Sequence, residues 1–308
     1  MKEVLVIYYT QSGQLFDILE NITTTLKKES EVNITYHKIS LENPFPFPWT
    51  KEKFYDAFPE SFLQIPAKIH PPKEEVFDKK YDLILLGYQV WFLTPSPAVN
   101  SFLNSMEAKK LLKDTPVVTV VACRNMWIQA QEKVKKLLVD NQAELAGHIA
   151  LVDRHINHIS VITIEHWMFS GKKDRLWGIF PKPGVSDEEI ANASKFGKPI
   201  REALLCDDYQ NLQNNLLALD AVKINPYLIK VDERGNFVFS KWANLLIKKG
   251  SPGNPSRTKW LGLFKFYLKF AIWVIAPIVF IVFLLTYLPT ARKRKRDKEY
   301  YSSVLLKE

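Results

Sequence analysis

The sequence predicts a three-layer α/β/α fold, in which a doubly wound parallel β-sheet lies between helices and a hydrophobic helix follows near the C-terminus. Three short and largely apolar runs, at residues 4–9, 82–87 and 117–122, carry the prediction of the sheet. They lack the polar alternation of half-exposed strands, so each is expected to be buried on both faces. Apolar residues at helical spacing follow each run, and strands that alternate with helices form parallel sheets.

The loop after the first strand has the composition of an anion cradle. It consists of Thr10, Gln11, Ser12, Gly13 and Gln14, contains no acidic residue, and precedes an amphipathic helix. Backbone N–H groups at the helix start and the two hydroxyls can donate hydrogen bonds to a phosphate, and a glycine lets the backbone approach it closely. An ordinary turn between a strand and a helix has a similar composition, so the interpretation depends on two later loops.

Those two loops are expected at the same edge of the sheet. The second strand of the three ends in Gln89, Val90, Trp91 and Phe92, and the third ends in Cys123, Arg124, Asn125, Met126 and Trp127. The carboxyl ends of parallel strands share one edge, and doubly wound sheets bind their ligands there. The three loops therefore predict a single ligand site.

The remaining segments give weaker signals. Residues 32–36 alternate like a half-exposed strand, residues 148–153 predict another strand, and residues 160–164 predict a further strand or its continuation. A capped helix is expected over 186–205, and residues 232–236 are interpreted as a hairpin turn between strands at 228–231 and 237–239.

A long insertion over residues 43–72 contains seven prolines and two clusters of aromatic residues. The prolines argue against a long regular element, and a loop of this length in a compact domain is often a binding loop or a lid. Simple cover for one edge of the sheet accounts for the insertion equally well.

The net charge of +9 belongs almost entirely to the C-terminal part of the chain. Residues 251–308 contain 11 Lys or Arg and three Asp or Glu, a net charge of +8. Residues 1–250 contain 31 Lys or Arg and 30 Asp or Glu, a net charge of +1. A neutral body argues against nucleic acid as a partner. Two cysteines give no disulfide framework and no signal peptide is recognisable, so we expect the body in the cytoplasm.

Residues 270–288 form a run of 19 residues without a charge, which is long enough to cross a bilayer as a helix. An interfacial pattern of aromatic residues and lysines precedes the run, and the polybasic segment 292–296 follows it, so we expect residues 260–296 to contact membrane lipid. Both flanks are basic, and Pro277 lies near the middle. The sequence thus leaves two topologies open: a single span, or a re-entrant anchor with both flanks in the cytoplasm. The membrane is expected to be the inner membrane of a bacterium.

Over about residues 1–165 the three loops resemble those of the flavodoxin-like FMN-binding family. The resemblance implies FMN as the cofactor, with residues 10–14 around its phosphate, 89–92 on one side of the isoalloxazine ring and 124–127 on the other. Leu15 departs from the pattern, because many flavodoxins have Thr or Ser there, although related quinone reductases also have an apolar residue. Carrier flavodoxins are small and acidic, whereas this body is long and neutral.

The opening residues 3–14, the loop 123–127 and the apolar tail also resemble the dialkylresorcinol-forming aromatases of flexirubin and aryl-polyene pigment pathways. This resemblance implies that the enzyme dehydrogenates a lipophilic dialkylcyclohexanedione to a dialkylresorcinol. Two alternatives stay open: a membrane-bound NAD(P)H-dependent quinone or flavin reductase, and a non-catalytic redox or scaffold subunit with a partner surface in 207–255. No metal-binding spacing is present, and a homodimer is compatible with the sequence.

Oxidation of a cyclic diketone by a flavin also needs a base for the accompanying proton. His155 and His158 follow a predicted strand and have the ordinary pKa range of a base, so we predict that one of them is catalytic. Surface or capping histidines are the alternative, His166 is a weaker candidate, and Cys123 is expected to be a buried thiol. The expected organisation is a flavin domain over 1–205, an extension or linker over 206–255, a membrane segment over 256–291 and a basic cytosolic tail over 292–308.

Overall fold

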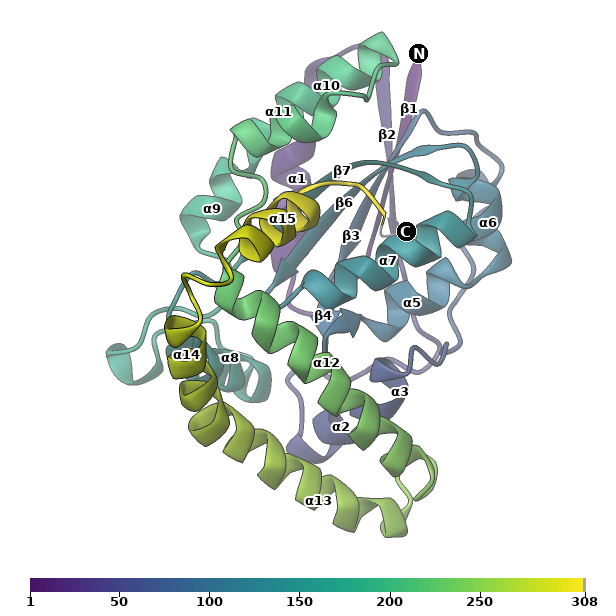
Figure 1. Ribbon diagram of the computed structural model, residues 1–308. Helices are drawn as coiled ribbons and strands as arrows, with labels where there is room; N and C mark the ends of the chain where they lie inside the picture. Colours follow the sequence, from purple (N-terminus) through teal and green to yellow (C-terminus); the bar gives the residue numbers. More distant parts are fainter. Residues whose placement is uncertain (307–308) are drawn as a thin grey trace.

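The computed structural model describes residues 1–306 and has a five-stranded sheet between two layers of helices (Figure 1). The strands are β1 (Lys2–Tyr8), β2 (Val32–Lys38), β3 (Leu83–Tyr88), β6 (Pro116–Cys123) and β7 (Glu144–Val152). Their order is β2-β1-β3-β6-β7, and every neighbouring pair is parallel. The predicted doubly wound sheet is confirmed, and its strand order reverses next to β1, where such sheets bind ligands.

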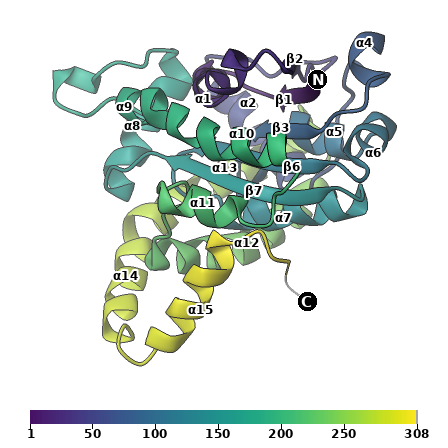
Figure 2. The ribbon, with the colours of Figure 1, turned by 90° about the horizontal axis from the view of Figure 1, so that it is seen from above.

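Helices cover both faces of the sheet (Figures 1 and 2). One layer contains α1 (Gln14–Thr23), α9 (Asp187–Ala191), the 3₁₀ helix η3 (Asn192–Phe196), α10 (Gly197–Cys206) and α11 (Leu212–Ala218). The other contains α5 (Pro97–Leu103), α6 (Met106–Leu112) and α7 (Ile128–Asp140). The helix expected over 186–205 is thus divided into three consecutive helical segments.

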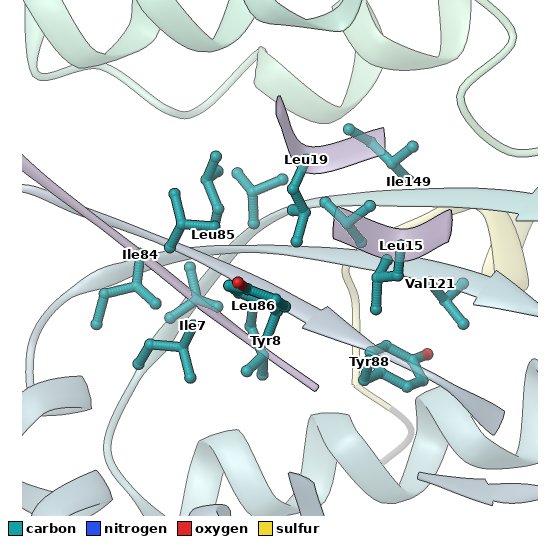
Figure 3. Packing of buried hydrophobic residues seen from close by; sticks show 14 of the residues in the cluster. Ile7, Tyr8, Leu15, Leu19, Ile84, Leu85, Leu86, Tyr88, Val121 and Ile149 are labelled. Carbon is teal, nitrogen blue, oxygen red and sulfur yellow. The ribbon is translucent and has the colours of Figure 1, made fainter. Parts of the chain in front are cut away.

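The main apolar core lies on both sides of the central strands. Figure 3 shows Leu15 and Leu19 of α1 packed on one face of the sheet, while Ile7 and Tyr88 belong to strands within it. The same buried cluster includes Leu212, Leu216, Ile229 and Tyr301. Residues beyond position 205, which the sequence assigned to an extension, therefore contribute to the main core.

Gly197 is required where α10 crosses α1. A Cβ atom at this position would lie 2.3 Å from the backbone oxygen of Ile22, so α10 would have to move away. We expect Gly197→Ala to lower the free energy of unfolding by about 2 kcal/mol, the typical cost of overpacking.

Urea unfolding of the full chain in detergent measures this effect, with Gly262→Ala as the matched control. Nothing lies within 4 Å of a Cβ atom built on Gly262, which is exposed on a helix. The control should raise stability slightly, by about 0.5 kcal/mol, because alanine favours helices over glycine. Equal effects of the two substitutions would contradict the packing argument.

Two segments differ from their predicted structure. Residues 160–164 lie in α8 (Asn157–Ser170), because the Ser160 hydroxyl donates to the Asp153 carboxylate at 2.8 Å and thereby closes the chain into a helix after β7. Residues 232–236 lie inside α12 (Pro226–Ile247), so the predicted hairpin is wrong. Pro226 and the Asn225 side chain, which accepts the Tyr227 N–H at 3.0 Å, start this helix.

The insertion forms two short helices, α2 (Lys51–Asp56) and α3 (Phe58–Phe62), and a four-residue helix α4 (Glu74–Phe77) follows it. It packs on the C-terminal helices and forms a second apolar cluster, in which the rings of Phe58 and Phe264 stack at 4.0 Å. The insertion therefore does more than cover a sheet edge, because it joins the body to the C-terminal part of the chain.

The apolar run belongs to one bent helix of 31 residues, Pro255–Leu285. It comprises α13 (Pro255–Phe270), the π-helical segment η4 (Ala271–Ile275) and α14 (Ala276–Leu285). After it, α15 (Ala291–Ser302) returns to the body (Figure 1). Pro277 is the second residue of α14, just beyond η4, and the bend lies there because a proline cannot donate to the helical ladder.

Candidate functional site

The three predicted loops meet in a cavity of about 390 Å³ at the carboxyl ends of β1, β3 and β6. The insertion, α8, α12 and the bend of the apolar helix complete its walls. Ten of the predicted residues line it directly: Gln11, Ser12, Gln14, Gln89, Val90, Trp91, Phe92, Arg124, Asn125 and Met126. Thr10, Gly13 and Trp127 lie behind this surface, since Thr10 accepts the Gly13 N–H at 3.1 Å and Trp127 packs on His148.

The start of α1 is open toward the cavity. Gly13 has a φ of 86°, in the left-handed region that favours glycine, and nothing lies within 4 Å of a Cβ atom built on it. No side chain caps α1, so the first N–H groups of the helix have neither a helical partner nor a capping partner. The Ser12 hydroxyl also lacks a hydrogen-bond partner among residues 1–306.

The two glutamines of this loop hold other segments against it. Gln14 exchanges two hydrogen bonds with the backbone of Val185, at 3.0 and 3.2 Å. The side-chain oxygen Oε1 of Gln11 accepts a hydrogen bond from the indole N–H of Trp49 at 3.0 Å. Their side chains therefore position the covering segments around the loop.

Aromatic rings form the second wall. Trp91 packs edge-on against Phe45 and Trp49, each at 5.1 Å between ring centroids, and Phe92 lies 4.9 Å from Phe54. Phe92 and Leu93 have φ values of 51° and 64° in a two-residue turn between β4 (Val90–Trp91) and β5 (Thr94–Pro95). Positive φ at both central residues is the type I′ geometry, and it is costly for side chains of this size.

Asn157 organises the third wall, and no pattern in the sequence singled it out. Its side-chain oxygen Oδ1 accepts hydrogen bonds from the Arg124 guanidinium at 2.7 Å and from the Asn125 side-chain amide at 2.9 Å. Two buried oxygens of this cavity, Gln89 Oε1 and Asn125 Oδ1, have no hydrogen-bond partner among the described residues. Burial lowers the pKa of Arg124, but a guanidinium stays charged, and no carboxylate among residues 1–306 forms an ion pair with it.

Neither predicted catalytic histidine lines this cavity. His155 is exposed on the loop before α8, and the Nε2 of His158 lies 3.0 Å from the carbonyl oxygen of Ile272 in the apolar helix. Glu165, which was not among the predicted residues, does line the cavity from α8. Burial raises the pKa of Cys123 far above the usual range, so its thiol stays protonated.

Both histidines line a second cavity, of about 650 Å³, next to the first. Its walls come from the end of β7, the start of α8, residues 223–228 and α14. Asn125, Asn157 and Ala276 line both cavities. The two cavities are therefore neighbours that share one wall of polar amides.

Asp232 of α12 lies buried beneath these cavities, and its carboxylate accepts the Gln129 N–H at the start of α7 at 3.2 Å. Burial raises the pKa of Asp232 from 3.8 to about 7. The folded protein therefore holds a proton that the unfolded chain releases, and the free energy of unfolding should fall as the pH rises from about 4 to 7. Asp232→Asn removes this titration.

We therefore compare the free energy of unfolding of Asp232→Asn with that of wild type. The difference, variant minus wild type, should increase by about 2 kcal/mol between pH 5 and pH 8. Urea unfolding at several pH values measures the difference. The buried His148, whose pKa is lowered to about 3 by burial, contributes equally to both proteins and cancels. Parallel stability curves for the two proteins would contradict the prediction.

Both ends of the apolar helix are fixed to the same domain. At its start, Arg257 has no exposed side-chain surface and pairs with Asp56 at 3.0 Å and Glu60 at 2.6 Å, both in the insertion. Beyond its end, the Tyr300 hydroxyl of α15 donates to Glu132 of α7 at 2.6 Å. The first part of the helix buries Leu261 and Phe264 in the second apolar cluster, whereas none of its most apolar window is buried.

No protein-family model and no curated protein matches the chain. Among solved structures, it is similar to a flavoprotein from Lactobacillus acidophilus in complex with FMN, at 17% identity and a TM-score of 0.36, over 49% of this chain and 93% of that one. The chain is also similar to a flavodoxin from the domain Archaea, at 11% identity and a TM-score of 0.38, over 66% of this chain and 99% of that one. A flavone reductase is similar at 13% identity and a TM-score of 0.37, over 68% of this chain and 65% of that one.

At such identities and TM-scores these similarities do not assign the fold. The strand order carries the assignment instead: five parallel strands in the order 2-1-3-4-5, with a cavity at the β1/β3 edge, are the flavodoxin-like arrangement. The protein thus has a flavodoxin-like fold with one long apolar helix near its C-terminus.

Proposed function

We propose that this protein is an FMN-dependent oxidoreductase that works at a membrane surface. The cavity of the three loops carries the proposal, because it joins an uncapped helix start to aromatic walls. A phosphate fits the free N–H groups of α1 and the Ser12 hydroxyl. Trp91 and Met126 would flank the isoalloxazine ring, and the unpartnered oxygens of Gln89 and Asn125 would accept its N–H group.

The proposed reaction is the dehydrogenation of a dialkylcyclohexanedione to a dialkylresorcinol. The reaction removes a hydride and a proton: oxidised FMN, when bound, would supply the hydride acceptor, and a base of the protein would accept the proton. Arg124 would stabilise the negative charge of the substrate enolate, since its guanidinium forms no ion pair among the described residues and interacts only electrostatically with Asp153 and Glu165. The aromatic rings of the insertion and of residues 91–92 would exclude water.

His158 stays our prediction for the base, with Glu165 as a second candidate. Because the His158 Nε2 faces the carbonyl oxygen of Ile272, the proton of the neutral ring belongs on Nε2. Its Nδ1 is then left with the lone pair that a base needs. Glu165 lines the flavin cavity itself, whereas His158 would act on a substrate that extends into the neighbouring cavity.

Anaerobic bleaching of the flavin absorbance tests the reaction. Purified full-length protein in detergent should be yellow, with one FMN per chain, and a 2,5-dialkylcyclohexane-1,3-dione should bleach it faster than NADPH does. Faster bleaching by NADPH would favour the quinone or flavin reductase. A colourless protein that FMN cannot reconstitute would contradict both enzymes and favour the scaffold subunit.

The fixed ends of the apolar helix also support a proposal for the membrane topology. Arg257 and α15 contact one and the same domain, so both flanks would lie on the cytoplasmic side. The helix would then lie in the interface rather than cross the bilayer, with the basic residues 292–296 at anionic headgroups.

Single cysteines at Ser251 and Ser303, in a Cys206→Ser background, test this topology. We expect a membrane-impermeant maleimide to label both from the cytoplasmic side, in inside-out vesicles, and neither in intact spheroplasts. Cys123 is only partly buried, but its raised pKa keeps the thiol protonated, so it should stay unlabelled in folded protein. Labelling of the two positions from opposite sides would contradict the proposal and favour a single span.

A further inference from the structure

We propose that the second cavity is a binding site for the alkyl chain of a membrane amphiphile, which enters it from the bilayer beside α14. The inference rests on the membrane attachment proposed above, and it adds a substrate site that is separate from the flavin cavity. Its volume of about 650 Å³ exceeds the 390 Å³ of the flavin cavity. A chain-binding role needs an apolar interior, an opening toward lipid and access to the reacting centre.

The apolar part of the cavity lies against the exposed helix. Phe280 and Ile281 of α14 form one side, and Ile224 and Leu228 of the body form the other. Ile281 is 56% exposed and Ile278, which is also on α14, is 57% exposed, so the outer face of the same helix is free to contact lipid. An alkyl chain can therefore move from the bilayer into the cavity along a continuous apolar surface.

The bend of the helix explains why this cavity is present. In η4 the Ala276 N–H donates to the carbonyl oxygen of Ala271, five residues back, and the next bond in this pattern would need an N–H on Pro277. The carbonyl oxygen of Ile272 is thus left without a helical partner, and His158 Nε2 binds it at 3.0 Å. The hydroxyl of Tyr227 donates to the carbonyl oxygen of Ala276 at 2.9 Å.

These two hydrogen bonds attach the bent segment to the body at a fixed distance. The rings of Phe280 and Phe283 of α14 also pack on the Tyr227 ring, with centroids 5.1 and 5.6 Å apart. The cavity lies between α14 and the start of α12, beside these contacts. The hydrogen bonds and the Tyr227 ring thus hold α14 in place and leave an apolar site next to it.

The polar end of the cavity points to the flavin site. Asn125 and Asn157 form the wall that the two cavities share, and Asn125 is only 8% exposed, with an unpartnered Oδ1. An amphiphile would therefore direct its polar head toward the amides and Arg124, and its chain toward Leu228 and Phe280. A substrate with two alkyl chains would use the apolar walls of both cavities.

Photolabelling tests the site without relying on enzyme activity. Full-length protein is bound to vesicles of phosphatidylglycerol and phosphatidylethanolamine that contain a 16-carbon fatty acid with a mid-chain diazirine. Trypsin should release two diagnostic peptides, 224–230 from the inner wall and 270–292 from the apolar helix. We expect label on both peptides, whereas surface contact with lipid alone would label only 270–292 and overturn the inference.

Leu228→Trp fills the cavity from the body side and should lower the labelling of 224–230 at least five-fold, with 270–292 unchanged. Phe237→Trp, at a position 64% exposed on the same helix, is the matched control and should leave both unchanged. Undiminished labelling of 224–230 in Leu228→Trp would overturn the site, as would a failure of the protein to bind the vesicles. The FMN content of each sample separates the two proposals, because loss of FMN with intact labelling contradicts only the proposed oxidoreductase.

Discussion

Arg257→Met should lower the free energy of unfolding by about 3 kcal/mol. The Arg257 side chain is fully buried, and its two terminal nitrogens contact both oxygens of Glu60, at 2.6 and 2.7 Å, while Nε pairs with Asp56. Methionine has a similar length but leaves two partly buried carboxylates without their cation. Removing one partner of a buried pair costs more than the pair contributes, because the remaining charges stay desolvated.

Urea unfolding of the detergent-solubilised protein measures this loss, and Lys259→Met is the matched control. Lys259 is exposed on the same helix and should change stability by less than about 0.5 kcal/mol. Adding Glu60→Gln to Arg257→Met should restore at least about 1 kcal/mol, since one uncompensated charge disappears. A loss below about 1 kcal/mol in Arg257→Met would indicate that α13 is held by its aromatic contacts alone.

The ion pairs of Arg257 matter beyond stability, because they connect the apolar helix to the insertion that covers the cavity of the three loops. Glu60 and Asp56 belong to the same short helices as Phe54 and Phe58, and Phe54 lines the cavity wall. We therefore expect Arg257→Met to loosen FMN as well as the helix. Sequence distance hides this connection, since Asp56 and Arg257 are 201 positions apart.

The strands and the three loops could be predicted because their signals are local. An uninterrupted apolar run such as 83–86 has few alternatives to a buried strand, and the loop after it must then lie at the ligand-binding edge. The side chains that connect these loops gave no such signal. Asn157 reaches Arg124 and Asn125 only in the folded chain, and a single asparagine before an apolar segment is equally typical of a helix cap or a surface turn.

Gly235 accounts for the largest error in secondary structure. In the sequence 232–236 it indicates a turn, yet it lies inside α12 with ordinary helical geometry. A Cβ atom on Gly235 would lie 3.0 Å from the Leu93 side chain, so this glycine allows α12 to approach the strained turn of the second loop. Tertiary packing, rather than local conformation, selects glycine here, and no pattern of neighbouring residues reveals it.

Ser12→Asp should weaken FMN binding by about 100-fold or more. The proposed phosphate site has free N–H groups at the start of α1 and no acidic residue in residues 10–14. Counting one pair of unit charges only, which is a lower bound for a phosphate, a carboxylate in contact with it costs about 4 kcal/mol at the effective dielectric constant of a protein surface. The helix dipole offsets part of this cost, which leaves about 3 kcal/mol, and each 1.4 kcal/mol is a factor of ten in affinity.

Two controls separate the charge from the change of side-chain shape. Ser12→Asn has nearly the same shape without the charge, so it should bind FMN within ten-fold of wild type. Riboflavin, which lacks the phosphate, should bind all three proteins with similar affinity, as measured by quenching of flavin fluorescence. An equal loss of riboflavin and FMN affinity in Ser12→Asp would mean that the substitution damages the ring site, and the phosphate would then have to bind elsewhere. A loss confined to FMN would identify the start of α1 as the phosphate site, because only the phosphate distinguishes the two ligands.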